Sequence, residues 1–125
     1  MAMPPRFILL VALGLAAVHD ASAAPPAALQ FKRDIRPILS EKCFQCHGPD
    51  PKKRDSGLRL DIAEEAIKDR KGIRAIVPGQ PDASEVILRV THHDDDVMPP
   101  ATAKIGTLTS EELATLRRWI SEGAP

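Results

Sequence analysis

Large aromatic side chains are scarce in this 125-residue sequence, which has no tyrosine, one tryptophan and three phenylalanines. With so few rings to fill a core, a single small domain of this size has only a marginal amount of apolar volume to bury. A buried group that is not part of the polypeptide would supply the missing volume. The composition is therefore a first, weak indication of a bound cofactor.

An excess of charge of either sign is also absent, because 17 Lys and Arg side chains balance 17 Asp and Glu side chains. Nucleic-acid binding usually requires a basic face, so this balance gives it no support. Cysteine is equally rare: Cys43 and Cys46 are the two cysteines, three positions apart. Two cysteines so close together do not cross-link distant parts of a chain, so we expect them to serve another purpose.

The one long apolar run lies near the N-terminus. Residues 1–6 carry one positive charge, the 12 residues from Phe7 to Val18 are apolar, and Ala21-Ser22-Ala23 has the small-x-small pattern of a cleavage site. These are the three regions of a secretory signal peptide, and the run is shorter than the ~20 residues of a membrane-spanning anchor. We predict a signal peptide over residues 1–23, a linker over 24–33 and one domain over 34–125, exported to the periplasm or another compartment outside the cytoplasm.

No segment alternates between apolar and polar residues for long enough to predict a strand, so the domain is expected to be all-α. The first helix is predicted from about Asp34, as its cap, to Lys42. The second begins at Asp61, where Asp61 and Glu64 resemble a capping box, and ends before Gly72. Asp82 and Glu85 open a third, short helix.

The last helix has the strongest signals. Thr109 and Glu112 form a capping box, Leu108 and Leu113 have the spacing of a hydrophobic staple, and Gly123 ends the helix. Its apolar stripe predicts packing against the first helix. The stripe consists of Leu113, Leu116, Trp119 and Ile120.

Residues 43–47 read Cys-Phe-Gln-Cys-His, which is C-x-x-C-H, the attachment sequence for c-type haem. Two thiols three positions apart at a helix end can reach the two vinyl groups on one edge of a porphyrin, and the adjacent histidine can direct a nitrogen at the iron. We therefore expect one covalent haem c on Cys43 and Cys46, with His47 as an axial ligand.

Other uses of two nearby cysteines stay open at this point. A redox dithiol usually follows a strand and opens a helix, whereas here an amphipathic helix precedes the cysteines. A zinc site requires four ligands, and the sequence has no second pair of suitable spacing. A pair of cysteines with a purely structural role is the third alternative.

A second axial ligand is expected from Met98, the only methionine after the predicted cleavage site. Two prolines follow it directly and stiffen the loop, which would hold the thioether in place over the haem. A lone methionine often only fills a core. His92 and His93 are rival ligands, although Asp94, Asp95 and Asp96 beside them are more typical of a solvated loop.

With these motifs in hand, the chain resembles the planctomycete-type cytochrome c domain family from Phe31 to about Ala124. The resemblance includes Phe31–Leu39 leading into the C-x-x-C-H motif, Leu58–Asp61, Ile76–Gly79, Ser84, Met98–Pro100, Trp119-Ile120 and Gly123-Ala124. It implies a class I cytochrome c-like fold, with short helices and proline-rich loops wrapped around one haem held by Cys43, Cys46, His47 and Met98. Family members are usually the first domain of a much larger protein, so both a stand-alone carrier and a piece of a longer chain stay open.

The expected function is the transfer of single electrons between redox partners outside the cytoplasm, as a carrier and not an enzyme, or as the electron-transfer domain of a larger redox enzyme. The residues Lys52-Lys53-Arg54 could steer an acidic partner to the haem edge or simply be solvated. A haem-based gas or redox sensor is an alternative, and a C-x-x-C thiol oxidoreductase is another.

Overall fold

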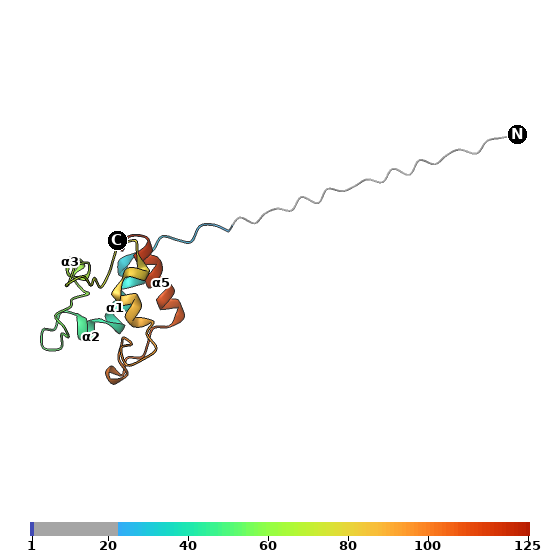
Figure 1. The fold of residues 1–125 in the computed structure, drawn as a ribbon. Coiled ribbons are helices and arrows are strands. Elements are labelled where there is room, and N and C mark those ends of the chain that lie inside the picture. Colours follow the sequence, from blue (N-terminus) through green and yellow to red (C-terminus); the bar gives the residue numbers. More distant parts are fainter. Residues whose placement is uncertain (2–22) are drawn as a thin grey trace.

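The computed structural model describes Met1 and residues 23–125, and the predicted signal peptide lies outside this part of the chain except for its two end residues. Within the described part there are helices and no strands, which confirms the all-α prediction. None of the helices there is both long enough and apolar enough to cross a membrane. Long loops join short helices, and α2 (Phe44–His47) and α3 (Ala63–Ala66) lie on the side away from α5 (Ser110–Ser121) (Figure 1).

The helical elements follow one another with no regular spacing. They are the π-helical turn η1 (Phe31–Ile35), α1 (Arg36–Lys42), α2 (Phe44–His47), α3 (Ala63–Ala66), the 3-10 turn η2 (Pro81–Ala83), α4 (Glu85–Val90), the 3-10 turn η3 (Ala101–Ala103) and α5 (Ser110–Ser121).

The first helix begins at Phe31, earlier than the predicted start at Asp34. Asp34 therefore lies inside the first turn, where its carboxylate accepts hydrogen bonds from the Gln30 backbone nitrogen at 2.7 Å and from Arg33 Nε at 2.8 Å. Pro37 is tolerated because it stands in the first turn of α1, where a missing N–H costs no helical hydrogen bond. The helix buries Ile35 and Leu39.

The second helix is much shorter than predicted, since α3 spans only Ala63–Ala66. The expected capping box does not form: Ile62 occupies the cap position and no side chain caps the helix. The Asp61 carboxylate instead pairs with the Arg59 guanidinium, which also lowers the pKa of Asp61. A carboxylate held two residues away is no longer available for the helix start.

The third predicted helix is present as η2 followed by α4. Ser84 lies between them and is completely buried. Its hydroxyl donates to the Gln80 carbonyl oxygen at 2.9 Å and accepts from the Val77 backbone nitrogen at 2.9 Å. The buried hydroxyl is thereby satisfied, and the Pro78-Gly79 turn is fastened to the start of α4.

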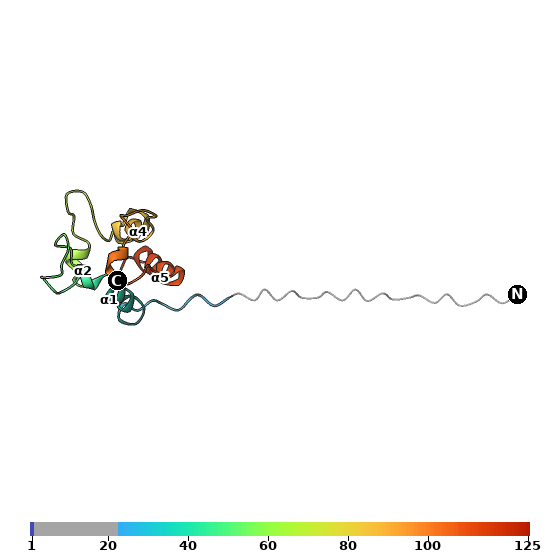
Figure 2. The same cartoon turned by 90° about the horizontal axis from the view of Figure 1, so that it is seen from below.

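Helix α5 closes the core, and its predicted capping box between Thr109 and Glu112 is confirmed. It packs against η1, η2 and α4, so the predicted contact between the first and last helices is made by the first turn. There the rings of Phe31 and Trp119 lie 5.7 Å apart, and both views show α1 and α5 on the same side of the domain (Figures 1 and 2). The most deeply buried apolar residues are Ile35, Leu39, Ile76, Ile87, Leu116 and Ile120.

Candidate functional site

The C-x-x-C-H motif lies at the junction of α1 and α2. Two carbonyl oxygens of the motif accept hydrogen bonds from the loop that follows: that of Cys46 from the Asp55 nitrogen at 2.7 Å, and that of His47 from the Leu60 nitrogen at 2.8 Å. The last helical carbonyls have no partner within their own helix, so these bonds satisfy them. The loop is in this way fixed against the motif.

Gly48 makes the turn out of α2 possible. A Cβ atom at this position would stand 2.3 Å from the Phe44 carbonyl oxygen, which is far inside van der Waals contact. Only glycine allows the chain to turn back so closely beneath the motif. The Arg54 side chain braces the same turn through its Nε, which donates to the Gly48 carbonyl oxygen at 3.1 Å.

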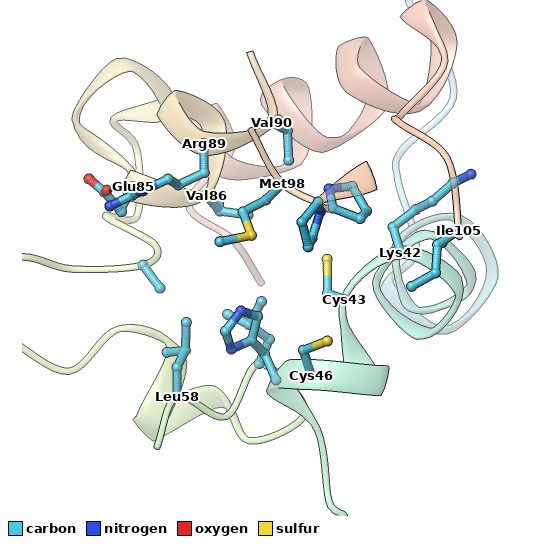
Figure 3. A pocket seen from close by; sticks show the side chains of 15 residues that line it. Lys42, Cys43, Cys46, Leu58, Glu85, Val86, Arg89, Val90, Met98 and Ile105 are labelled. Atoms are coloured by element: carbon cyan, nitrogen blue, oxygen red, sulfur yellow. Dashed lines mark hydrogen bonds and ion pairs between the residues drawn. The ribbon is translucent and has the colours of Figure 1, made fainter. Parts of the chain in front are cut away.

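An apolar pocket opens beside the motif and contains about 590 Å³ of unfilled space, part of it open to solvent. Cys43, Cys46, His47 and Met98 all line it, so the structure brings the four predicted site residues together. Figure 3 shows Cys43, Cys46 and Met98 around the open space. The apolar part of the wall consists of Leu58, Leu60, Ala75, Val86, Val90, Pro99, Pro100 and Ile105.

Met98 reaches this pocket from the loop after α4. Its backbone nitrogen donates to the carbonyl oxygen of Arg89 at 3.0 Å, which ties the loop to the last turn of that helix. Its thioether lies across the open space from Cys43 and Cys46 (Figure 3). Pro99, which follows it, is buried in the pocket wall.

The His47 imidazole is half-buried, and its burial lowers its pKa, against an opposing effect of Asp55. A lowered pKa favours the neutral ring, which is the form that binds metals. The Nδ1 atom is fully buried and makes no hydrogen bond of ordinary geometry within the described part of the chain. Native structures rarely leave a buried polar atom without a partner, so this site calls for explanation.

The two cysteines are free thiols and do not form a disulfide with each other. Burial, with a smaller contribution from Cys46, raises the pKa of the Cys43 thiol to about 12. Thiol oxidoreductases depend on a cysteine whose pKa is lowered, because the thiolate is the reacting species. The environment of Cys43 therefore does not favour the dithiol alternative.

The rival ligands lie elsewhere. His92 and His93 are exposed and do not line the pocket, and His92 Nδ1 lies 3.0 Å from a carboxylate oxygen of Asp94. Among residues 23–125 and Met1, no group of three or more His, Cys, Asp or Glu side chains is arranged to hold a metal ion. The zinc alternative thus gains no support from this part of the chain.

Two arginines of the site were not predicted. Arg89 lines the pocket, and Arg70 lines a second hollow that continues from it. Arg89 follows Glu85 by four positions, a spacing that indicates only an ordinary surface ion pair along a helix. No sequence signal distinguishes Arg70 from its basic neighbours.

Comparison with known proteins gives a match to a family model. Residues 43–102 match the family model described as Planctomycete cytochrome C. This segment belongs to the planctomycete cytochrome c family. It begins at Cys43 and extends beyond Met98, so it includes all four predicted site residues, and the family as a whole points to haem binding and electron transfer. No curated protein and no solved structure matched the chain.

Proposed function

We propose that this chain is an exported c-type cytochrome domain that carries one haem and transfers single electrons between redox partners. Cys43 and Cys46 would attach the haem through thioether bonds, and His47 and Met98 would be its two axial ligands. The fold would be the class I cytochrome c arrangement, in which helices and proline-rich loops surround the haem.

One observation carries the proposal: the C-x-x-C-H motif and Met98, far apart in the sequence, line one apolar pocket. A methionine that only filled the core would not be expected to line the same pocket as two thiols and an imidazole. Nor would a purely structural pair of cysteines be expected to border an apolar hollow in so small a domain. Both facts are expected if the pocket receives a large apolar cofactor.

The donor atoms also fit haem. An imidazole and a thioether form the axial pair of many c-type cytochromes, and the soft, neutral sulfur favours ferrous iron. The Nδ1 of His47 is buried, so the other ring nitrogen is the one that would face the metal.

When bound, haem supplies an iron atom that cycles between the ferric and ferrous states. The residues of the chain hold and tune it. The apolar wall excludes water, Leu60 and Asp55 fix the backbone of the motif, and the Arg89 carbonyl fixes the loop of Met98. Rigid ligands require little rearrangement when the charge of the iron changes, which is the property that an electron carrier needs.

The proposed location is outside the cytoplasm, and it rests on the signal-peptide pattern of residues 1–23 and on the cytochrome c family. The exposed Lys52 and Lys53 are candidates for contact with an acidic partner, whereas Arg54 is partly engaged in bracing the turn at Gly48. We therefore include only the two lysines in the proposed docking region.

Expression with haem-attachment machinery tests the proposal. The purified protein should keep its colour after extraction with acid and acetone, and its mass should exceed that of the processed polypeptide by one haem. A double change of Cys43→Ala and Cys46→Ala should abolish covalent attachment. Colour that extracts from the wild type, or a haem that stays attached to the double variant, would refute it.

A further inference from the structure

A second hollow continues from the pocket and has a polar rim. It shares His47, Met98, Glu85 and Arg89 with the pocket, and it adds Arg70 and Lys71. Neither Cys43 nor Cys46 lines it. The hollow thus opens at a part of the site away from the thiols, and three cationic side chains border it.

Arg70 has one donor that the described part of the chain leaves unused. Its terminal nitrogen binds a Glu65 carboxylate oxygen at 2.7 Å and approaches the Gly57 carbonyl oxygen at 3.4 Å. Its Nε is completely buried and has no hydrogen-bond partner among the described residues. A buried, unpartnered guanidinium nitrogen is costly, so an acceptor at this position would stabilise the fold.

Arg89 borders both hollows. Its Nε binds a Glu85 carboxylate oxygen at 2.7 Å and its Nη1 lies 3.6 Å from a carboxylate oxygen of Asp96, so two of its three nitrogens already face carboxylates. Figure 3 shows Arg89 and Glu85 on one side of the open space and Cys43 and Cys46 on the other. The site therefore has one end with the two thiols and an opposite end with Arg89 and its partner Glu85.

Haem likewise has two chemically different edges. Its vinyl groups, which react with cysteine thiols, stand on one edge of the ring, and its two propionate carboxylates stand on the opposite edge. We propose that Arg70 and Arg89 together bind the propionates of the haem. This inference rests on the proposed function, and it assigns to two named residues the anchoring of the end that the cysteines do not hold.

The surrounding charges are compatible with two bound carboxylates. Lys71 adds a third cation at the rim, while Asp55 and Glu85 also line the hollow and Glu65 and Asp96 pair with the two arginines. Among the side chains that line the hollow itself, three cations stand against two carboxylates, so loss of either arginine would remove the excess of positive charge that faces the propionates. Arginine suits such sites because its planar fork meets a carboxylate with two donors.

The test measures the reduction potential of the haem-loaded protein as a function of pH. An adjacent guanidinium lowers the pKa of a carboxyl by about 1–3 pH units. Arg70→Gln should therefore move the pH range in which the potential varies upward by about one unit, and should lower the potential at neutral pH. Arg89→Gln, on a different element, should move this pH range upward as well, and Arg70→Lys should move it by a smaller amount.

Lys68→Gln is the matched control. Lys68 pairs with the same Glu65 at 3.2 Å but does not line the hollow, so its loss removes the same charge without removing a propionate donor. An Arg70→Gln profile that coincides with that of Lys68→Gln would overturn the assignment of Arg70. If Arg70→Gln does not fold, the test rests on Arg89→Gln and Arg70→Lys. A wild-type dependence of the reduction potential on pH in both of these variants would refute the proposal. Covalent haem in the wild type with unshifted variants refutes only this inference, whereas a wild type without haem refutes the proposed function and this inference with it.

Discussion

The backbone nitrogen of Met98 donates a hydrogen bond to the carbonyl oxygen of Arg89 at 3.0 Å. This bond joins the residue that would bind the iron to the helix whose side chain would bind the propionates. The backbone of α4 and the loop after it therefore form one unit on the side of the pocket opposite the C-x-x-C-H motif. A substitution in this loop should therefore alter the position of the Met98 thioether without moving the thiols of Cys43 and Cys46.

The first prediction concerns Met98 itself. If its sulfur binds the iron, the oxidised protein should show the weak near-infrared band of charge transfer from methionine to ferric iron. Met98→Ala should abolish that band and lower the reduction potential, because water or another less ferrous-selective donor would take the position. Near-infrared spectra and a redox titration of the two proteins check this.

The exposed histidines provide the control for Met98. Changing His92 and His93 together to alanine should leave both the band and the potential unchanged, since neither side chain lines the pocket. If the double change removes the sixth ligand and Met98→Ala does not, the ligand is a histidine. A methionine that only fills space would instead cost stability, ~2–5 kcal/mol on change to alanine, with the spectrum unaltered.

Gly48 gives the second prediction, which concerns stability and haem loading together. In Gly48→Ala the new methyl group would collide with the Phe44 carbonyl oxygen, 2.3 Å away, and the end of α2 would have to move. We expect a loss of about 1–3 kcal/mol in the free energy of unfolding, the usual cost of forced overpacking. The ratio of haem to protein should also fall, because His47 is the neighbouring residue.

Gly72→Ala is a suitable comparison for that variant. Gly72 has open space around its Cβ position but a φ of +87°, so alanine there is penalised by the backbone alone. Its cost should be about 1 kcal/mol, with normal haem loading. Urea unfolding and the haem absorbance of both variants provide the measurement. Equal loading in the two would show that the turn at Gly48 does not position the motif.

The fold could be predicted from the sequence where the deciding contacts are local. Thr109 and Glu112 cap α5 as expected, because each side chain needs only to reach the backbone three residues away. Asp61 and Glu64 present nearly the same pattern, yet the cap is absent because Arg59 takes the Asp61 carboxylate. A motif that depends on one carboxylate fails when a competing partner is equally near.

In the candidate site, too, the residues that a local pattern specifies could be predicted, and those that depend on the fold could not. Cys43, Cys46 and His47 could be selected because their spacing alone specifies the chemistry. Met98 required a further assumption about the loop, and the pocket now gives that assumption a physical basis. The arginines could not be foreseen, because the bond that leaves Arg70 Nε unused depends on Glu65 and Gly57, which the fold brings to it.

The last prediction concerns the start of the first helix at acid pH. Hydrogen bonds from Arg33 and from the Gln30 backbone lower the pKa of Asp34 from its ordinary value of 3.8 to about 2. The folded state therefore binds this proton less readily than the unfolded state, so the contribution of Asp34 to stability is complete above its unfolded pKa and is lost as the pH falls toward 2. Nuclear magnetic resonance titration of the Asp34 carboxyl should show a midpoint near 2. Arg33→Gln should raise the midpoint toward 3.8, whereas Arg36→Gln, which removes a charge two residues along the chain but neither hydrogen bond, should change it little. A wild-type midpoint near the ordinary value would mean that Asp34 does not hold the first turn of this helix in solution.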